Sequence, residues 1–406
     1  MGSTTSGSDI LRDKKIVLGV SGGIAAYKSV LLLRLLIKQG AAVRVLMTEN
    51  AGHFVGPLTF EALSGLKVHS SLFSDSDDAG IGHIEWAAEA DAVIIAPATA
   101  NVVGKLANGI ADDALSTFLM AVTAPVVVCP AMNTNMYESR AVQRNLDILR
   151  KDGFKIIEPG AGELACGTTG PGKLPEPEEI LDRFTAHLTT KDLRGKNILV
   201  TAGPTQEEID PVRFISNPSS GKMGFALARA AEHRGARVTL VTGPSHLTDP
   251  FNVNTLRVTN TAEMAEAVFD NFGDMDVVIK SAAVSDYRVK APSHQKMKKH
   301  KSEMVLELVK NNDILKALGQ KKGNRILVGF AAETQDLENN AQAKLKAKNL
   351  DIIAANLIGP EDSGFRSDKN RLTLFFRDGS TEHLDTMEKN AAAHVLLDRV
   401  ARLMPV

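Results

Sequence analysis

The sequence has few cysteines, almost no net charge and no long apolar run, and each of these absences narrows the class of protein. Two cysteines among 406 residues cannot form a disulfide framework. Forty-seven basic and 48 acidic side chains leave a formal net charge of −1, which disfavours wholesale binding to nucleic acid or to an anionic membrane. We find no secretory signal and no bilayer-spanning segment. We therefore expect a cytoplasmic protein that binds neither nucleic acid nor membrane.

Chain length and strand pattern predict two α/β domains. A chain of 406 residues exceeds the size at which one hydrophobic core keeps growing. Short β-branched runs alternate with helical stretches, which is typical of a doubly wound parallel sheet with helices on both faces. This pattern lapses into a polar segment at 189–196 and then restarts, so we predict Rossmann-like domains at residues 1–190 and 191–406. The expected strands are 15–18, 43–47, 92–95, 126–128, 197–201, 238–241, 276–279, 326–330 and 351–354, with helices near 24–38 and 262–269.

The two cysteines stand in different settings. Cys129 follows the apolar run 125–128, so we expect it to be buried as a small core residue. Cys166 lies in the stretch 163–175, which has three glycines and two prolines, and this composition excludes a long helix or a central strand. Cys166 is therefore expected in an exposed, shaped loop, either as an inert surface thiol or as a reactive group.

Several loops of the first domain are candidates for ligand binding. Ser21, Gly22 and Gly23 join the first strand to the first helix, where free backbone N–H groups suit a phosphate, although a tight turn also needs glycine. The turn matches neither a dinucleotide fingerprint nor a Walker A loop. The loops 96–101 and 130–137 leave the next strands at their carboxyl ends, so all three should meet at one crevice. Asn133 offers a donor and an acceptor there. A lone histidine, His83, would usually be structural or merely exposed.

Five short motifs in order resemble the flavin-dependent cysteine decarboxylases, specifically the phosphopantothenoylcysteine decarboxylases. They are residues 21–28, His83, residues 96–101, residues 130–133 with Met136, and residues 165–167. The resemblance implies a flavodoxin-like domain that binds FMN. It implies that His83 is the catalytic base, that Asn133 binds the substrate carboxylate, and that Cys166 on a mobile flap is the proton donor. Tyr137 and Lys173 depart from the family, where tryptophan and arginine are common. The implied FMN contacts are Ser21, Gly22, Gly23, Thr48, Thr99, Asn101 and Ser116.

The second domain also carries candidate anion sites. Gly203 and the helix start at 219–221 suit an anion, or form an ordered loop capped by serine. A lysine cluster at 296–301 follows Asp286 by ten residues. Such a run is usually a solvated stretch, but a triphosphate would also need these cations and a carboxylate-held Mg²⁺.

The motifs of this half resemble the phosphopantothenate–cysteine ligases of the CTP-using bacterial type. They are residues 203–205, 213–224, 282–286, the Lys296 cluster, 310–314, 329–334, and Lys344 with Lys348. The resemblance implies that Asn217 stabilises an acyl-cytidylate and that Mg²⁺ or Mn²⁺ assists. Gln206 stands where the family has arginine. The implied CTP contacts are Ala282, Asp286, Lys296, Asp313, Ile314, Leu315, Phe330, Lys344 and Lys348.

Together the two resemblances imply a bifunctional enzyme of coenzyme A biosynthesis that acts on 4'-phosphopantothenate, cysteine and CTP. They also imply a homo-oligomer, with N-terminal trimers joined through C-terminal dimers. Two alternatives stay open. The first is another FMN enzyme, a flavin prenyltransferase or a peptide-cysteine decarboxylase, which the second domain disfavours. The second is a non-catalytic flavoprotein regulator, which the presence of His83, Asn133 and Cys166 disfavours.

Overall fold

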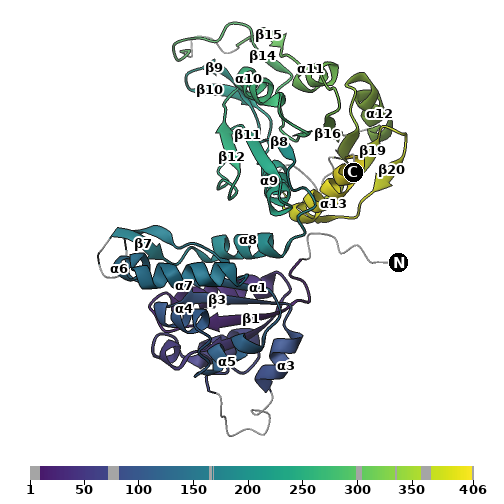
Figure 1. Cartoon of the computed structure of the whole chain (residues 1–406). Helices are drawn as coiled ribbons and strands as arrows, with labels where there is room; N and C mark the ends of the chain where they lie inside the picture. The colour runs from purple at the N-terminus through teal and green to yellow at the C-terminus, as the bar shows by residue number, and fades with distance from the viewer. Residues whose placement is uncertain are drawn as a thin grey trace. The chain divides into compact units, whose positions relative to one another are not determined.

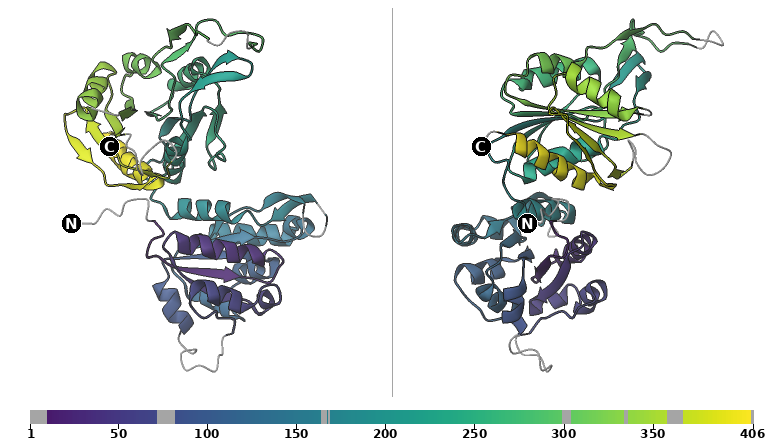
Figure 2. Two further views of the ribbon diagram at one scale, coloured as in Figure 1. Left: turned by 180° about the vertical axis from the view of Figure 1, so that it is seen from behind. Right: turned by 90° about the vertical axis from the view of Figure 1, so that its right-hand side faces the viewer.

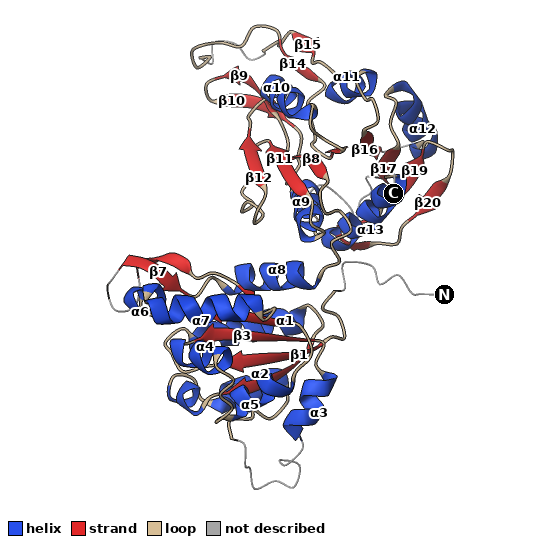
Figure 3. Cartoon of the chain, in the orientation of Figure 1, coloured by secondary structure: helices blue, strands red, loops and turns tan. Residues whose placement is uncertain are grey.

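The computed structural model describes residues 10–71, 82–163, 167, 169–298, 304–333, 336–357 and 367–404 (Figure 1). The chain divides into two compact units, Asp9–Leu188 and Thr189–Val406. Each unit is built around its own sheet, and helices cover the sheets (Figures 2 and 3). No helix among these described ranges is long and apolar enough to cross a membrane.

A five-stranded parallel sheet organises the first unit, in the order β2-β1-β3-β4-β5. Its strands are β1 (Lys15–Val20), β2 (Ala42–Met47), β3 (Ala92–Ala98), β4 (Val126–Pro130) and β5 (Lys155–Ile156). The helices are α1 (Ala26–Lys38), η2 (Glu49–His53), α2 (Pro57–Ser64), α3 (Gly82–Glu89), α4 (Ala100–Ala107), α5 (Ala114–Ala121), α6 (Thr134–Glu138), α7 (Arg140–Lys151) and α8 (Pro177–Leu188). An antiparallel hairpin, β6 (Gly160–Glu163) and β7 (Thr169–Lys173), lies outside this sheet.

The strands of this sheet are buried on both faces. Along β3, Ile94 belongs to one hydrophobic cluster, whereas Val93 and Ile95 belong to another. Because successive side chains of a strand point to opposite faces, the two clusters lie on opposite sides of the sheet. Helix α1 supplies Leu33 to the first cluster, and α5 supplies Phe118 to the second. The doubly wound arrangement predicted from the β-branched runs is confirmed.

An eight-stranded sheet organises the second unit, in the order β12-β11-β8-β13-β16-β17-β19-β20. Its strands are β8 (Asn197–Ala202), β11 (Arg237–Thr242), β12 (Asn254–Arg257), β13 (Val277–Lys280), β16 (Ile326–Glu333), β17 (Ile352–Leu357), β19 (Thr373–Phe376) and β20 (Thr381–His383). Three two-stranded antiparallel pairs are separate from this sheet: β9 (Gln206–Asp210) with β10 (Arg213–Ser216), β14 (Tyr287–Val289) with β15 (Leu308–Lys310), and β18 (Lys369–Asn370) with β21 (Met387–Glu388). The helices are α9 (Lys222–His233), α10 (Thr261–Phe272), α11 (Ile314–Gln320), α12 (Leu337–Ala347) and α13 (Lys389–Leu403).

The second sheet departs from the expected parallel pattern at one edge. Strands β12 to β17 are parallel, but β19 and β20 pair in the antiparallel sense. Only four residues join β19 to β20, and Gly379 among them has φ +92°. So short a connection forms a hairpin, since a parallel pair needs a crossover of a dozen or more residues. The Asp378-Gly379 pair is a common hairpin signal.

Glycine at one position allows a helix to lie directly on the second sheet. A Cβ atom on Gly224 of α9 would stand 2.5 Å from Ala202 Cβ and 2.9 Å from the Thr201 carbonyl oxygen of β8. Since backbone atoms of a central strand cannot rotate away, only glycine fits without moving the helix.

We predict that Gly224→Ala lowers the free energy of unfolding by about 1 to 3 kcal/mol, because α9 must shift away from β8. Urea unfolding of the full chain measures this change. Gly273→Ala is the matched control, since its added Cβ would meet nothing within 4 Å. Equal stability of the two variants would show that the close approach of α9 does not matter.

Candidate functional site

The turn between β1 and α1 brings three predicted phosphate contacts to the carboxyl end of the first sheet. A Cβ on Gly22 would lie 2.5 Å from Asn50 Cβ, so glycine allows η2 to pack on the turn. Gly23 is open, with only Thr99 Cγ2 at 3.7 Å from such a Cβ. The buried Ser21 hydroxyl donates to the Pro97 carbonyl at 2.8 Å and accepts from the Thr99 amide at 2.9 Å. Because the Ser21 hydroxyl proton is donated to Pro97, the donors that this turn can offer to an anion are its backbone N–H groups.

A pocket of about 420 Å³ opens beside this turn. The loops after β1, β3 and β4 and strand β7 all contribute to it, as expected for the carboxyl edge of a parallel sheet. Four of the predicted site residues line it together: Gly22, Gly23, Thr99 and Asn133. The further lining residues are Ile24, Ala25, Tyr27, Lys28, Pro97, Ala100, Ala131, Met132, Met136, Glu163, Gly172, Lys173 and Leu174.

The β6–β7 hairpin packs closely on the loop that carries Asn133. The Met132 amide donates to the Gly172 carbonyl at 3.0 Å, and Gly172 has φ +130°. A Cβ on Gly170 would lie 2.7 Å from Thr134 Oγ1. Asn133 caps α6, since its side chain accepts from the Asn135 amide at 2.9 Å. Both strands of the hairpin contribute to the pocket lining, through Glu163 of β6 and through Gly172 and Lys173 of β7.

Lys28 anchors the end of this hairpin, a role that the sequence did not reveal. Its side chain is buried, and its ammonium group donates to the Leu174 carbonyl at 2.9 Å and to Glu176 Oε1 at 2.8 Å. A buried ammonium needs such partners because its desolvation is costly. The available signal was a lysine on the same face of α1 as the apolar residues Leu32 and Leu36, at a spacing of four residues.

Three other predicted residues of the first unit, Thr48, Asn101 and Ser116, do not line this pocket. Thr48 is buried, and its Oγ1 has no hydrogen-bond partner among the described residues. Asn101 is exposed at the start of α4. Ser116 forms a capping box with Asp113, whose carboxylate accepts from the Ser116 amide at 2.8 Å. The His83 side chain and all of Cys166 lie outside the described residues.

Cys129 is fully buried on β4, as predicted. Burial raises the pKa of its thiol far above the ordinary value, so it stays protonated near neutral pH. Such a thiol packs as a small apolar side chain and is not a nucleophile.

In the second unit, the predicted anion loops meet at the carboxyl ends of β8 and β11. Gly203 has φ +73°, and a Cβ there would stand 3.1 Å from the Gly243 carbonyl oxygen. Gly221 precedes α9 with φ +80°, and a Cβ on it would stand 3.3 Å from the Gly203 nitrogen. Glycine thus permits three backbone segments to approach one another where an anion would bind.

Asn217 connects these loops to the segment after β13. Its side-chain amide donates to the carbonyls of Ala283 at 3.1 Å and Val284 at 3.2 Å. The Ala282 amide in turn donates to Thr201 Oγ1 at 3.1 Å. The side chain of Asn217, on the loop after β10, is therefore held against the loop after β13, which carries Ala282.

A network of polar side chains that the sequence did not predict holds the loop after β13 in place. Glu207 accepts from the Thr261 amide at 3.0 Å and from its hydroxyl at 2.5 Å. The Thr205 hydroxyl accepts from the Ser285 amide at 3.0 Å, and Asn311 donates to the Ser285 carbonyl at 2.9 Å. The network ties the loop after β13 to β9, α10 and the segment before α11.

Of the other residues predicted to bind the nucleotide, Asp313 and Lys348 are in direct contact. Asp313 caps α11 and forms an ion pair of 2.8 Å with Lys348, which follows α12. Although burial opposes the change, this ion pair lowers the pKa of the Asp313 carboxyl. Ile314 and Leu315 are core residues at 2% and 5% exposure, so only their backbone is available to a ligand.

Phe330 on β16 is half-buried, whereas Lys344, Asp286 and Lys296 are exposed. The segment that carries Lys296 is held by the β9–β10 hairpin, where the Met297 amide donates to Asp210 Oδ2 at 3.1 Å. No cluster of three or more histidine, cysteine or acidic side chains that could hold a metal occurs among the described residues.

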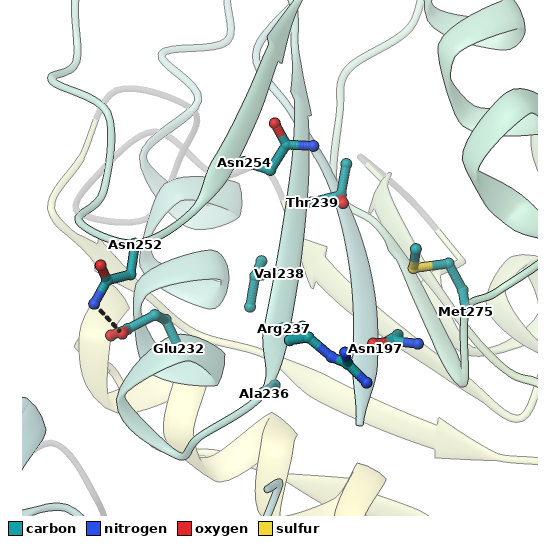
Figure 4. Close-up of a pocket in the computed structure, with 9 residues that line it drawn as sticks. All are labelled: Asn197, Glu232, Ala236, Arg237, Val238, Thr239, Asn252, Asn254 and Met275. Carbon is teal, nitrogen blue, oxygen red and sulfur yellow. Dashed lines mark hydrogen bonds between the residues drawn. The ribbon is translucent and has the colours of Figure 1, made fainter. Parts of the chain in front are cut away.

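A second cavity, of about 440 Å³, lies at the opposite edge of this sheet (Figure 4). Asn197 and Arg237 begin β8 and β11 there, and Glu232 accepts a hydrogen bond of 3.0 Å from Asn252. None of the predicted nucleotide residues lines it. The amino ends of parallel strands are not where such sheets bind ligands, so this cavity is separate from the predicted site.

Comparison with known proteins agrees with this two-part organisation. Residues 4–189 match the family model described as Flavoprotein, and residues 193–404 match the C-terminal domain of the DNA/pantothenate metabolism flavoproteins. The coenzyme A biosynthesis bifunctional protein CoaBC of Bacillus subtilis is 50% identical over 398 residues, which cover 97% of this chain and 98% of the relative.

Relatives from two other bacteria are similar over nearly the same length. The CoaBC protein of Vibrio cholerae is 46% identical over 97% of this chain and 99% of its own. That of Escherichia coli K12 is 46% identical over 96% of this chain and 97% of its own. The chain therefore belongs to the family of the bifunctional coenzyme A biosynthesis proteins CoaBC.

Proposed function

We propose that residues 191–406 join cysteine to 4'-phosphopantothenate at the expense of CTP, and that residues 1–190 decarboxylate the product to 4'-phosphopantetheine. The observation that carries the first half is the pocket that gathers Gly22, Gly23, Thr99 and Asn133 beside the hairpin around residue 166. The product of one half is the substrate of the other, which gives the fusion a rationale.

The residues of the first unit fit FMN. The glycine turn offers backbone N–H groups for its phosphate, and a mostly apolar pocket beside the turn can receive a planar ring. The buried Thr48 hydroxyl has no partner among the described residues, and a bound polar ligand would satisfy it. Thr99, Asn101 and Ser116 are the further proposed contacts.

The chain's own groups then assist a decarboxylation that the substrate alone cannot undergo. Loss of CO₂ next to a CH₂–SH group would leave an unstabilised carbanion. Bound FMN supplies the chemistry that oxidises the thiol to a thioaldehyde and later reduces the product. Asn133 holds the substrate carboxylate, and His83 takes the proton released during oxidation. After CO₂ leaves, Cys166 protonates the enethiolate, for which a thiol of ordinary pKa about 8.5 is a competent acid.

In the second unit, the phosphopantothenate carboxylate attacks the α-phosphate of CTP and pyrophosphate leaves. The cysteine amine then displaces CMP from the acyl-cytidylate. Asn217, on the loop after β10, is held against the loop after β13 and stabilises this intermediate. Lys344, Lys348 and Lys296 supply positive charge to the phosphates, while Asp313 orders Lys348. Ala282, Asp286, Ile314, Leu315 and Phe330 complete the proposed nucleotide site.

Mg²⁺ or Mn²⁺ would bind through the triphosphate together with one carboxylate, for which we propose Asp286. This mode agrees with the lack of a larger acidic cluster among the described residues, because Mg²⁺ commonly uses one or two carboxylates with substrate phosphates. We further propose a cytoplasmic homo-oligomer, with trimers of the first domain joined by dimers of the second.

We predict that Cys166→Ser still oxidises and decarboxylates the substrate but accumulates the enethiol, because a serine hydroxyl is too weak an acid for the last proton transfer. Mass spectrometry of the products formed by the full chain measures this. Cys129→Ala is the control, and we expect it to make phosphopantetheine, since Cys129 is a core residue. Phosphopantetheine formation by Cys166→Ser at the normal rate would contradict the assignment.

We predict that Thr48→Val weakens FMN binding by about 3- to 10-fold, the loss of one neutral hydrogen bond. The stability of the flavin-free protein should not fall, because valine replaces a hydroxyl that has no partner in it. Flavin titration and thermal unfolding measure both effects. Ser116→Ala should instead lower stability, since Ser116 belongs to a capping box. Unchanged flavin affinity in Thr48→Val would remove Thr48 from the site.

We predict that Asn217→Asp abolishes most CMP release while the flavin spectrum and the decarboxylase reaction stay normal. A carboxylate cannot donate to the Ala283 and Val284 carbonyls, so the loop after β13 loses its position. Coupled CMP release and decarboxylation of added phosphopantothenoylcysteine are the two assays. A normal rate of CMP release in this variant would contradict the proposed role.

A further inference from the structure

Lys280 occupies the centre of the second unit's ligand-binding edge. It is the last residue of β13, and it stands in register with Thr201 of β8 on one side and Gly329 of β16 on the other. The flanking strands lead into the Gly203 loop and to Phe330. Its own strand continues into the loop with Ala282 and Asp286. The side chain therefore emerges among residues already proposed to bind the nucleotide.

The ammonium group of Lys280 lacks the partner that comparable lysines have. Within the described ranges, no hydrogen bond or ion pair reaches Lys280, although it is half-buried. By contrast, the buried Lys322 pairs with Asp351, and Lys348 pairs with Asp313 at 2.8 Å. A desolvated ammonium without a partner is unfavourable, so a purely structural lysine would be paired or exposed.

The charges around Lys280 also favour an anionic ligand. Desolvation, together with the positive charge of Lys348, lowers the pKa of Lys280 to about 8. The carboxylates of Asp313 and Asp286 act in the opposite direction. Asp313 is already paired with Lys348, and Asp286 is exposed at the end of the loop after β13. Among the described residues, neither carboxylate forms an ion pair with Lys280, and a phosphate group would supply that missing partner.

We propose that the Lys280 ammonium group binds the phosphate chain of the nucleoside triphosphate, alongside Lys348. This inference rests on the proposed CTP-dependent ligation in the second unit. A lysine here acts as a point charge, which suits phosphate oxygens whose exact orientation changes during phosphoryl chemistry. The sequence signal is a lysine at the end of the apolar run Val277-Val-Ile279.

The first test is a calorimetric titration of the full chain with CTP and Mg²⁺. We expect Lys280→Met to bind CTP about 10- to 100-fold more weakly, the effect of losing a hydrogen bond to a charged group. Lys280→Arg should recover part of this affinity because it retains the charge. Lys346→Met is the matched control, since Lys346 is an exposed residue of α12 outside the proposed site, and it should bind CTP normally.

The pH dependence of CTP binding by the wild-type protein provides a second test that needs no folded variant. The phosphates are fully ionised above pH 8, since their last pKa is near 6. We therefore expect the affinity to fall above about pH 8, where unliganded Lys280 loses its proton. Binding at pH 9 should take up a proton, which calorimetry in buffers of different ionisation enthalpy detects. Lys280→Met should lose this proton uptake.

The outcomes distinguish a failure of the proposed CTP-dependent function from a failure of the proposed role of Lys280. A wild-type protein that does not bind CTP contradicts the proposed function and the role of Lys280 together. Normal CTP affinity in Lys280→Met, with wild-type binding intact, overturns only the role of Lys280. Equal losses in Lys280→Met and Lys346→Met would show a general charge effect, which also overturns it. If Lys280→Met does not fold, a wild-type affinity that stays constant between pH 7.5 and about pH 9.5 overturns it.

Discussion

Close approach of backbone segments at the carboxyl edge of each sheet is the constraint on which both candidate sites depend. Parallel strands place the loops that follow them at one edge, and glycine lets neighbouring loops touch there. In the first unit, Gly22 lies against Asn50 and Gly172 against Met132. In the second, Gly203 lies against Gly243. These contacts keep backbone N–H groups near one another, which is what a phosphate ligand needs.

The lysines that are shielded from solvent differ in whether their ammonium group has a partner. Lys28 and Lys322 are buried with partners and hold parts of the chain in place. Lys280 is partly desolvated, and no hydrogen bond or ion pair reaches it from any residue that the structure describes, which is the basis of its proposed contact with a ligand. Burial alone therefore does not separate structural from functional cations. The presence or absence of a hydrogen-bond or ion-pair partner separates them.

The sequence predicted the inner strands of both sheets because they are short apolar runs that are buried on both faces, as in Ala92–Ala98. It did not predict β5, β12, β19 or β20, which lie at or near the sheet edges. It also predicted that the loops after β1, β3 and β4 meet, since this follows from strand direction. It could not reveal the bonds of Lys28 to Leu174, which lies 146 residues away and is reached only through tertiary packing. Nor could it show that the Ser21 hydroxyl is used by Pro97 and Thr99, or that Ile314 enters the core.

The central claim is that two sites on one chain carry out consecutive reactions. The most direct measurement gives the purified full chain 4'-phosphopantothenate, cysteine and CTP, and follows CMP and 4'-phosphopantetheine in the same reaction. The account predicts that both products form and that their final amounts are equal. CMP without phosphopantetheine, from a protein that retains its flavin, would contradict the assignment of the first unit. Absence of CMP would contradict that of the second.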